Sequence, residues 1–224
     1  MMFVPFIPPD RPRQSSFLAE PDPVQQIGPQ SWVLAGYALE SVRAVHEAVC
    51  AVLLDSPLRK MPTPQGWMSV TQSNCGDYGW VADRTGYRYT DSDPLTGRPW
   101  PKMPLELYQL AVSAAKQVGF TEFDPQACLI NHYLQGTRMG LHQDRDEADL
   151  QAPIVSISLG LPAVFQFGGI RRTDPVQKVI LQHGDVLVWG GVDRLRYHGV
   201  MTVKAAVGAP AHAHRLNLTF RRVT

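Results

Sequence analysis

The sequence contains no apolar run near the roughly 20 residues that a membrane-spanning helix needs. Its N-terminal residues lack the charged start and small-residue cleavage site of a secretory signal. Cysteine is also scarce: the three residues lie far apart and form no CxxC pair, so neither a disulfide framework nor a cysteine zinc site is expected. These absences predict a soluble, cytoplasmic protein that has no contact with a membrane.

Size and proline distribution predict one domain with an N-terminal arm. The 224 residues, 44% of them hydrophobic, are enough for one well-filled core and marginal for two. Seven of the 19 prolines fall within the first 29 residues, a density that hinders strand pairing and favours extended chain. We therefore expect a Pro-rich arm at residues 1–28 and a single catalytic domain, functioning as a monomer, at residues 29–224.

The net charge of +1 hides an asymmetry along the chain. Residues 150–224 carry nine Lys or Arg against three Asp, a net charge of +6, whereas residues 1–149 have a net charge of −5. A basic second half can bind phosphates even when the total is nearly neutral. An ordinary solvated surface would account for the same numbers, so charge alone leaves both interpretations open.

Hydrophobic spacing predicts two helices and then a β-rich core. Three- and four-residue steps from Leu39 to Leu53 indicate one amphipathic helix, and Pro104 and Gly119 bound a second. From residue 126 onward the apolar segments are short and alternating, with no helical pattern between them, which argues against a parallel sheet. The expected fold is mainly β with flanking helices: a double-stranded β-helix, or jelly roll, with its core at residues 126–224. The predicted strands are Ser31 to Tyr37, Ala127 to Leu134, Ile154 to Leu161, Val164 to Phe167, Val179 to Gln182, Val186 to Trp189 and Arg215 to Arg222.

The segment 57–101 mixes turn-forming residues with tryptophan and tyrosine. Aromatic side chains on loop-rich chain either fill a core or form stacking platforms for a flat ligand. We interpret the segment as a lid over a binding site, while core filling remains the alternative.

One group of residues has the spacing of a metal site. His142 and Asp144 are two positions apart, so extended backbone places both side chains on one face, and His198 follows on another strand-like segment. Two imidazoles and one carboxylate on one side of a cation form the open arrangement of non-haem Fe(II) oxygenases, although zinc accepts the same ligands. The pattern is short, and ordinary surface residues could also produce it.

The last predicted strand has one apolar face and one cationic face. Arg215, Asn217 and Arg221 alternate with leucine and phenylalanine. If the apolar face packs against the outer layer, two guanidinium groups point into the barrel, where without a counterion their burial is costly. A small dicarboxylate would pair with them. Asn131 and Tyr133 share one face of the strand that starts at Ala127, and both could donate to the same acid. A solvent-facing edge strand is the alternative.

Short blocks of sequence in one order are more specific than any single motif. They include Ser73-Asn74-Cys75-Gly76, Leu141-His142-Gln143-Asp144, Phe165-Gln166-Phe167-Gly168-Gly169, Tyr197-His198-Gly199 and Asn217-Leu218-Thr219-Phe220-Arg221. In these blocks, and from about Thr63 to its end, the chain resembles the AlkB-type Fe(II)- and 2-oxoglutarate-dependent nucleic-acid dealkylases.

The resemblance implies a reaction and the residues that support it. Fe(II) would be the cofactor, with 2-oxoglutarate and O2 as cosubstrates, and a base methylated on a ring nitrogen would lose its methyl group as formaldehyde while 2-oxoglutarate yields succinate and CO2. His142, Asp144 and His198 would hold the iron as the catalytic centre. Arg215 and Arg221 would bind the 2-oxoglutarate carboxylates, assisted by Asn131, Tyr133 and Asn217.

The resemblance also implies where the base binds. A base of the 1-methyladenine or 3-methylcytosine type is cationic and pairs poorly, so it is easily extruded and binds well between aromatic faces and near carboxylates. Alkylated DNA, preferably single-stranded, is the expected partner, with RNA as a second substrate. Matching positions assign substrate contacts to Trp80 and His142 as the sandwich, Tyr87 from the lid, Asp146 and Glu147 at the base edge, and Arg172, then Arg138, Arg145 and Arg171, at the phosphates.

Three alternatives stay open at this point. The first keeps the oxygenase chemistry but directs it to RNA or to a protein side chain. The second is a binder of damaged nucleic acid without catalysis, which the complete set of iron and arginine residues argues against. The third is a zinc hydrolase, for which Arg215 and Arg221 have no evident use.

Overall fold

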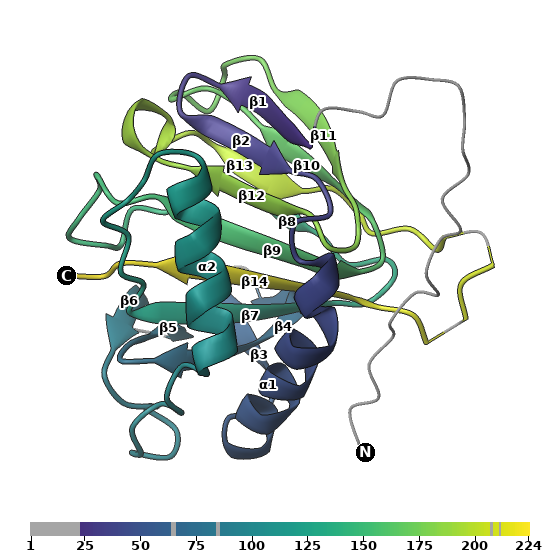
Figure 1. The fold of residues 1–224 in the computed structure, drawn as a ribbon. Coiled ribbons are helices and arrows are strands. Elements are labelled where there is room, and N and C mark those ends of the chain that lie inside the picture. Colours follow the sequence, from purple (N-terminus) through teal and green to yellow (C-terminus); the bar gives the residue numbers. More distant parts are fainter. Residues whose placement is uncertain (1–22, 64–65, 84–85, 207, 211) are drawn as a thin grey trace.

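Two antiparallel sheets build the core of the molecule (Figure 1). The computed structural model describes residues 23–63, 66–83, 86–206, 208–210 and 212–224. The large sheet has the strand order β1 (Val24–Gly28), β2 (Ser31–Leu34), β12 (Val186–Trp189), β9 (Ile154–Gly160), β14 (Arg215–Arg221), β7 (Ala127–Tyr133), β4 (Gly66–Gly76) and β3 (Arg59–Thr63). The second sheet has the order β11 (Gln177–Leu181), β10 (Ala163–Phe167), β13 (His198–Val200) and β8 (Met139–His142), and β5 (Gly79–Asp83) and β6 (Gly86–Thr90) form a separate hairpin. The expected jelly roll with flanking helices is confirmed.

Two helices cover the outer face of the large sheet (Figure 1). They are α1 (Val42–Asp55), which follows the 3-10 turn Leu39–Ser41, and α2 (Leu105–Gln117); a second 3-10 turn is Gly191–Asp193. Apolar residues of both helices pack against outward side chains of β7, β9, β12 and β14. The predicted limits of α2 hold: Pro104 precedes its first turn, and Gly119, with φ of +95°, ends it where the Phe120 amide donates to the Ala115 carbonyl.

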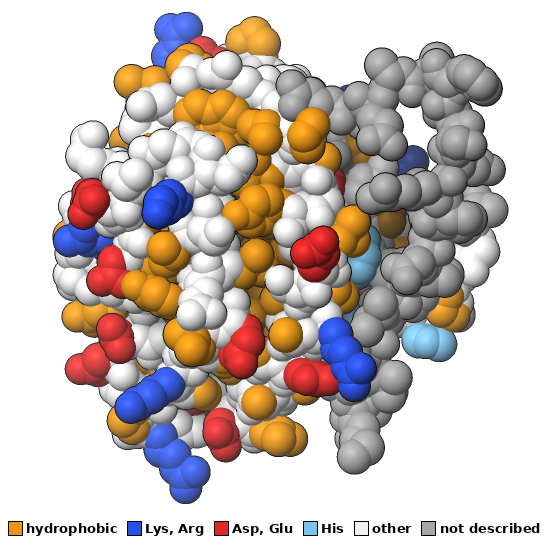
Figure 2. Space-filling model, in the orientation of Figure 1, with side chains coloured by type: hydrophobic (Ala, Val, Ile, Leu, Met, Phe, Trp, Pro, Cys, Tyr) orange, Lys and Arg blue, Asp and Glu red, His pale blue; other side chains and the backbone are white. Residues whose placement is uncertain are grey.

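The helical face offers no surface of a single charge sign in the part that the described residues form. Lys and Arg are interspersed there with Asp and Glu (Figure 2). None of the described helices has the length and apolarity needed to cross a membrane.

A second apolar cluster fills the space between the two sheets. Its members include Phe165 and Phe167 of β10 and Trp189 of β12. Strand geometry explains how one strand serves both clusters, because successive side chains point to opposite faces. On β14, Leu216, Leu218 and Phe220 enter the helix-covered cluster, so the odd-numbered residues face inward.

Two sequence predictions need correction. The predicted arm lies outside the described residues up to residue 22, but its end, Val24–Gly28, forms strand β1, because Pro29 and Gln30 make a turn that lets it pair with β2. The segment 57–101 contains more strand than expected: β3 and β4 belong to the large sheet. Pairing of β4 with β7 along six residue pairs outweighs the weak strand preference of its Asn, Ser and Gly residues.

Candidate active site

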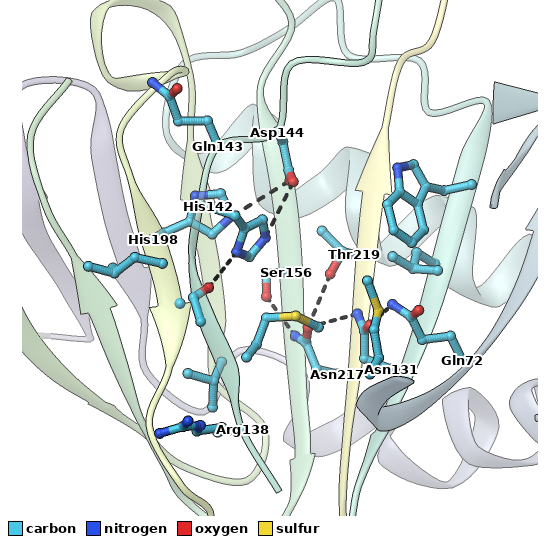
Figure 3. Close-up of a pocket in the computed structure, with 18 of the residues that line it drawn as sticks. Gln72, Asn131, Arg138, His142, Gln143, Asp144, Ser156, His198, Asn217 and Thr219 are labelled. Atoms are coloured by element: carbon cyan, nitrogen blue, oxygen red, sulfur yellow. Dashed lines mark hydrogen bonds and ion pairs between the residues drawn. The ribbon is translucent and has the colours of Figure 1, made fainter. Parts of the chain in front are cut away.

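His142, Asp144 and His198 converge at one edge of the second sheet (Figure 3). His142 ends β8 and His198 begins β13, and the two are directly opposite in the antiparallel pairing of these strands. Their ring centroids are 4.4 Å apart. Asp144 lies two residues past β8, with its oxygens 3.6 Å from Nε2 of His142 and 3.7 Å from Nε2 of His198. The three ligand atoms lie within 4.8 Å of one another, the only such group among the described residues.

Backbone carbonyls orient both imidazoles toward the carboxylate. Nδ1 of His142 is 2.9 Å from the Gly140 carbonyl oxygen, and Nδ1 of His198 is 3.0 Å from that of Arg196. Because a carbonyl only accepts, each Nδ1 carries the proton and each Nε2 keeps its lone pair for a metal. Burial, reinforced by His142, lowers the pKa of His198 to about 4, which keeps this ring neutral as a ligand must be.

Asp144 is ionised and is held by an internal arginine. Arg221 donates from Nε at 2.9 Å and from Nη2 at 2.7 Å to Oδ2 of Asp144. Burial favours the neutral carboxyl, but the charge of the Arg221 guanidinium outweighs it and keeps the pKa of Asp144 well below its usual value. The sequence predicts that Arg221 has no counterion in the protein, but the structure gives it Asp144 and, at 3.3 Å, Glu147 as counterions.

Glu147 lies in a buried ion pair that sequence analysis did not foresee. One of its oxygens accepts from Nη2 of Arg194 at 2.9 Å, and the other accepts from the Tyr89 hydroxyl at 2.6 Å. Arg194 also donates to the backbone carbonyls of Asp144 and Ala152, so it braces the loop that carries the ligand. No local motif marks Arg194, because its partners come together only when this loop folds over it.

Arg215 is a buried cation that has no carboxylate partner in the described part of the chain. Its side chain is 1% exposed, and among the described residues no acidic group lies within ion-pair distance of it. Its guanidinium donates to the hydroxyl of Ser158 at 2.8 Å and, over 3.4 Å, to the Leu161 carbonyl, while Nε has no partner in the described part of the chain. Burial lowers the pKa of Arg215 to about 10, so the group is still charged at neutral pH.

A row of polar side chains crosses the inner face of the large sheet (Figure 3). Gln72 donates to Asn131 at 2.7 Å, Asn131 to Asn217 at 3.4 Å, and Asn217 to the hydroxyl of Ser156 at 2.7 Å. The sequence predicts Asn131 and Asn217 at this site but gives no local signal for Gln72. Its strand parity would have indicated this position had β4 been recognised as a neighbour of β7.

The predicted base-binding residues lie at the cavity, with partners of their own. Trp80 of β5 stacks on Tyr87 of β6, with centroids 5.3 Å apart and planes 16° apart, and its Nε1 donates to Asp146 at 2.9 Å. Arg172 lies over the ring of Tyr197 and donates to the Leu141 carbonyl. One cavity of about 890 Å³ is lined by every residue predicted to bind the metal, the cosubstrate or the substrate except Arg171, which pairs instead with Asp174.

These residues fit a ferrous ion and a small dianionic acid. The two Nε2 atoms and the Asp144 carboxylate offer three ligands from one side, a donor set suited to Fe(II). Nε of Arg215 and Nη1 of Arg221 are buried donors that lack a partner among the described residues. A ligand carboxylate would satisfy such donors through charge-assisted hydrogen bonds.

Fold and site together define a non-haem iron oxygenase. Residues 33–221 match the model of the 2OG-Fe(II) oxygenase superfamily, so the chain belongs to this family, whose enzymes use Fe(II), 2-oxoglutarate and O2. The chain is 48% identical over 199 residues to the alpha-ketoglutarate-dependent dioxygenase AlkB of Salmonella typhimurium, which covers 88% of this chain and 92% of that relative. It is also 48% identical over 191 residues to AlkB of Escherichia coli, covering 85% of this chain and 88% of the relative.

A solved structure has the same architecture. The structure of OsALKBH1 superposes with a TM-score of 0.75 at 29% identity, covering 89% of this chain and 100% of that one. The predicted resemblance, enzyme class and cofactors are thus confirmed, and the zinc hydrolase and the non-catalytic binder are disfavoured.

Proposed function

We propose that this dioxygenase oxidatively removes methyl groups from ring nitrogens of bases in nucleic acid, with alkylated, preferably single-stranded DNA as its main substrate and RNA as a second. The observation that carries the proposal is that one cavity contains the His-Asp-His group, the unpaired Arg215 and an aromatic pair. The AlkB relatives support the nucleic-acid substrate, as does a relative from Mus musculus named nucleic acid dioxygenase ALKBH1, which is 33% identical over 125 residues that cover 55% of this chain and 32% of the relative.

Each group in the cavity has a distinct task. His142, Asp144 and His198 would hold Fe(II). Arg215 would bind one carboxylate of 2-oxoglutarate beside Tyr133, whose hydroxyl remains a donor because burial raises its pKa to about 12. Arg221 has Nη1 left for the other carboxylate while Nε and Nη2 hold Asp144. Asn131 and Asn217 would add neutral donors.

When bound, Fe(II) and 2-oxoglutarate supply the oxidation: one atom of O2 enters succinate as CO2 is released, and the other hydroxylates the substrate methyl group. The protein's task is to present that methyl group in a site shielded from water. The hydroxymethyl group on the ring nitrogen then leaves as formaldehyde, and the nitrogen recovers its normal bonding.

The aromatic pair and the acidic loop suit a cationic base. A methylated base would stack between Trp80 and His142, with Tyr87 of β6 supporting the other face of Trp80 and Asp146 facing the positive edge of the base. The ring contacts of the structure pair Trp80 with Tyr87 and His142 with His198, so a base entering between Trp80 and His142 would keep both pairs. Glu147 would act from behind the site, through Arg221 and Tyr89.

Phosphate contacts would come from arginines near the cavity mouth. Arg172, Arg138 and Arg145 line the cavity, and the guanidinium of Arg172 is held in place by the Leu141 carbonyl and the Tyr197 ring. Such contacts position a nucleic acid without reading its sequence.

The test compares oligonucleotides that carry 1-methyladenine or 3-methylcytosine as single-stranded DNA, duplex DNA and RNA, together with a methylated peptide. We expect formaldehyde and succinate in equal amounts, fastest with single-stranded DNA. Turnover of the peptide alone would refute the proposal, and faster turnover of RNA would reverse the substrate order.

We also propose the limits of the domain, its subdivision and its oligomeric state. We infer a single dioxygenase domain, predicted at residues 29–224 and extended by strand β1, with a nucleotide-recognition lid within residues 57–101 and a core at residues 126–224, active as a cytoplasmic monomer. Light scattering of the active protein across a range of concentrations would test the monomer.

A further inference from the structure

Gln72 begins the polar row that crosses the inner face of the large sheet. The sheet register places Gln72 of β4 opposite Asn131 of β7, and Asn131 opposite Asn217 of β14. All three side chains line the cavity, and each is at most 7% exposed. The row therefore lies where the keto acid is proposed to bind.

The direction of the hydrogen bonds along this row is fixed from its far end. Nδ2 of Asn217 is 3.2 Å from the backbone carbonyl of Ile157, which can only accept, so the amide nitrogen must lie on that side. Oδ1 of Asn217 then accepts from Nδ2 of Asn131, at 3.4 Å, and from the Thr219 hydroxyl. Oδ1 of Asn131 in turn requires a donor, which Nε2 of Gln72 supplies at 2.7 Å.

With the hydrogen bonds in this direction, Gln72 carries an energetic penalty for folding that packing alone does not explain. Its own carbonyl oxygen, Oε1, is buried and has no hydrogen-bond partner among the described residues. An unpaired buried acceptor opposes folding, and an apolar side chain of similar length would avoid the penalty. The amide at this position is therefore useful for what its nitrogen donates.

We propose that Gln72 is a positioning residue for the keto-acid cosubstrate: its short hydrogen bond to Oδ1 of Asn131 adds to the longer contact with Asn217 and holds the Asn131 amide with N–H rather than C=O toward the cavity. The inference rests on the proposed roles of Asn131 and Asn217. A carboxylate needs donors around it, and an Asn131 amide turned the other way would set one acceptor against another.

The experiment measures 2-oxoglutarate binding directly, by anaerobic calorimetry with Fe(II) present. Gln72→Met removes the donor and the unpaired acceptor while nearly keeping the side-chain length. We expect the Kd for 2-oxoglutarate to rise about tenfold. The unfolding temperature should stay equal or rise, and the KM for a methylated oligonucleotide should change less than twofold.

A double-mutant cycle separates positioning from general damage to the strand. If Gln72 acts through Asn131, Gln72→Met should have no further effect on the Kd once Asn131→Ala is present. Ser73→Ala is the matched control, because Ser73 is the next residue on β4 and donates to Ser56 on the other side of the sheet. That variant should lower the unfolding temperature and leave the Kd unchanged.

The outcomes that overturn the inference differ from those that overturn the proposed function. An unchanged Kd in Gln72→Met, or an equal loss with and without Asn131, refutes the role of Gln72 while the dealkylase stands. A wild-type protein that binds 2-oxoglutarate but leaves methylated oligonucleotides intact refutes the proposed substrate and does not affect the proposed role of Gln72. A wild-type protein that binds no 2-oxoglutarate refutes both.

Discussion

The two faces of the large sheet use the same strands but make different demands on their side chains. On β14, Leu216 and Leu218 turn outward into the cluster under α1 and α2, whereas Arg215 and Asn217 turn inward to the cavity. The outer residues are interchangeable in chemistry and constrained in volume. The inner residues are constrained in which atom donates, which accepts and which carries charge.

This difference separates stability from activity along a single strand. An outer side chain contributes apolar contact, so its loss lowers the free energy of unfolding. An inner polar side chain contributes little to folding, and a buried cation such as Arg215 even opposes it when no anion is bound. Substitutions on alternate residues of β14 should therefore produce different classes of defect.

The largest effect is expected from removal of an iron ligand on the inner side. His142→Ala should reduce formaldehyde and succinate formation by about a thousandfold or more, because two ligands cannot hold the metal in a defined geometry. The side chain of His142 is 40% exposed, so the unfolding temperature should barely move. His212→Ala, in an exposed loop, is the control. Turnover at the wild-type level in His142→Ala would refute the metal assignment.

A smaller effect, on stability alone, is expected from the outer side of β14. Leu218→Ala should lower the free energy of unfolding by about 3 kcal/mol, since Leu218 is fully buried beneath the helices. Below the unfolding transition, kcat and the KM for 2-oxoglutarate should match the wild type. Leu54→Ala, at a position that is 84% exposed, should cost less than about 0.5 kcal/mol. A tenfold loss of kcat in folded Leu218→Ala would mean that the two faces are not separable.

The sequence predicts the side chains of each face well when the residues involved are close together in the chain, and poorly when they are far apart. His142 and Asp144 are two residues apart, and Arg215, Asn217 and Arg221 share one strand, so alternation alone indicates their common side. The pairing of Arg221 with Asp144 joins residues 77 positions apart. Only the folded loop after β8 creates that contact. The same loop therefore decides that Arg221 has a carboxylate partner, whereas Arg215 has none among the described residues.

The same limit explains the other differences. Gln72 could not be assigned to the site because β4 carries several residues with weak strand preference, and its register on β7 is a tertiary property. The family resemblance predicts Glu147 beside Asp146 at the edge of the base, whereas in the structure its side chain is buried and paired with Arg194 from another loop. Sequence patterns thus specify which face a residue joins more readily than which partner it meets there.

The two cavity arginines offer a test within the inner face. Arg215→Met should raise the KM for 2-oxoglutarate tenfold to a hundredfold, roughly the loss of one or two charge-assisted hydrogen bonds. Without 2-oxoglutarate its unfolding temperature should stay equal or rise, because no carboxylate loses a partner. Arg221→Met should lower the unfolding temperature, because Asp144 and Glu147 lose a buried counterion. Equal destabilisation by both variants would contradict the conclusion that Arg221 has carboxylate partners and that Arg215 has none among the described residues.

The smallest effect is expected from a substitution at the cavity mouth, which we compare with a substitution on the helical face. Arg172→Ala should raise the KM for a methylated oligonucleotide about fivefold and reduce the slope of its salt dependence by about one, since one phosphate contact is lost. The KM for 2-oxoglutarate should not change, because Arg172 is held near the entrance by Tyr197 and Leu141. Arg43→Ala removes an equal charge from α1, where the side chain is 90% exposed, and should leave both constants unchanged. If the two variants weakened oligonucleotide binding equally, the nucleic acid would respond to net charge alone, and the cavity face would have no privileged role in binding it.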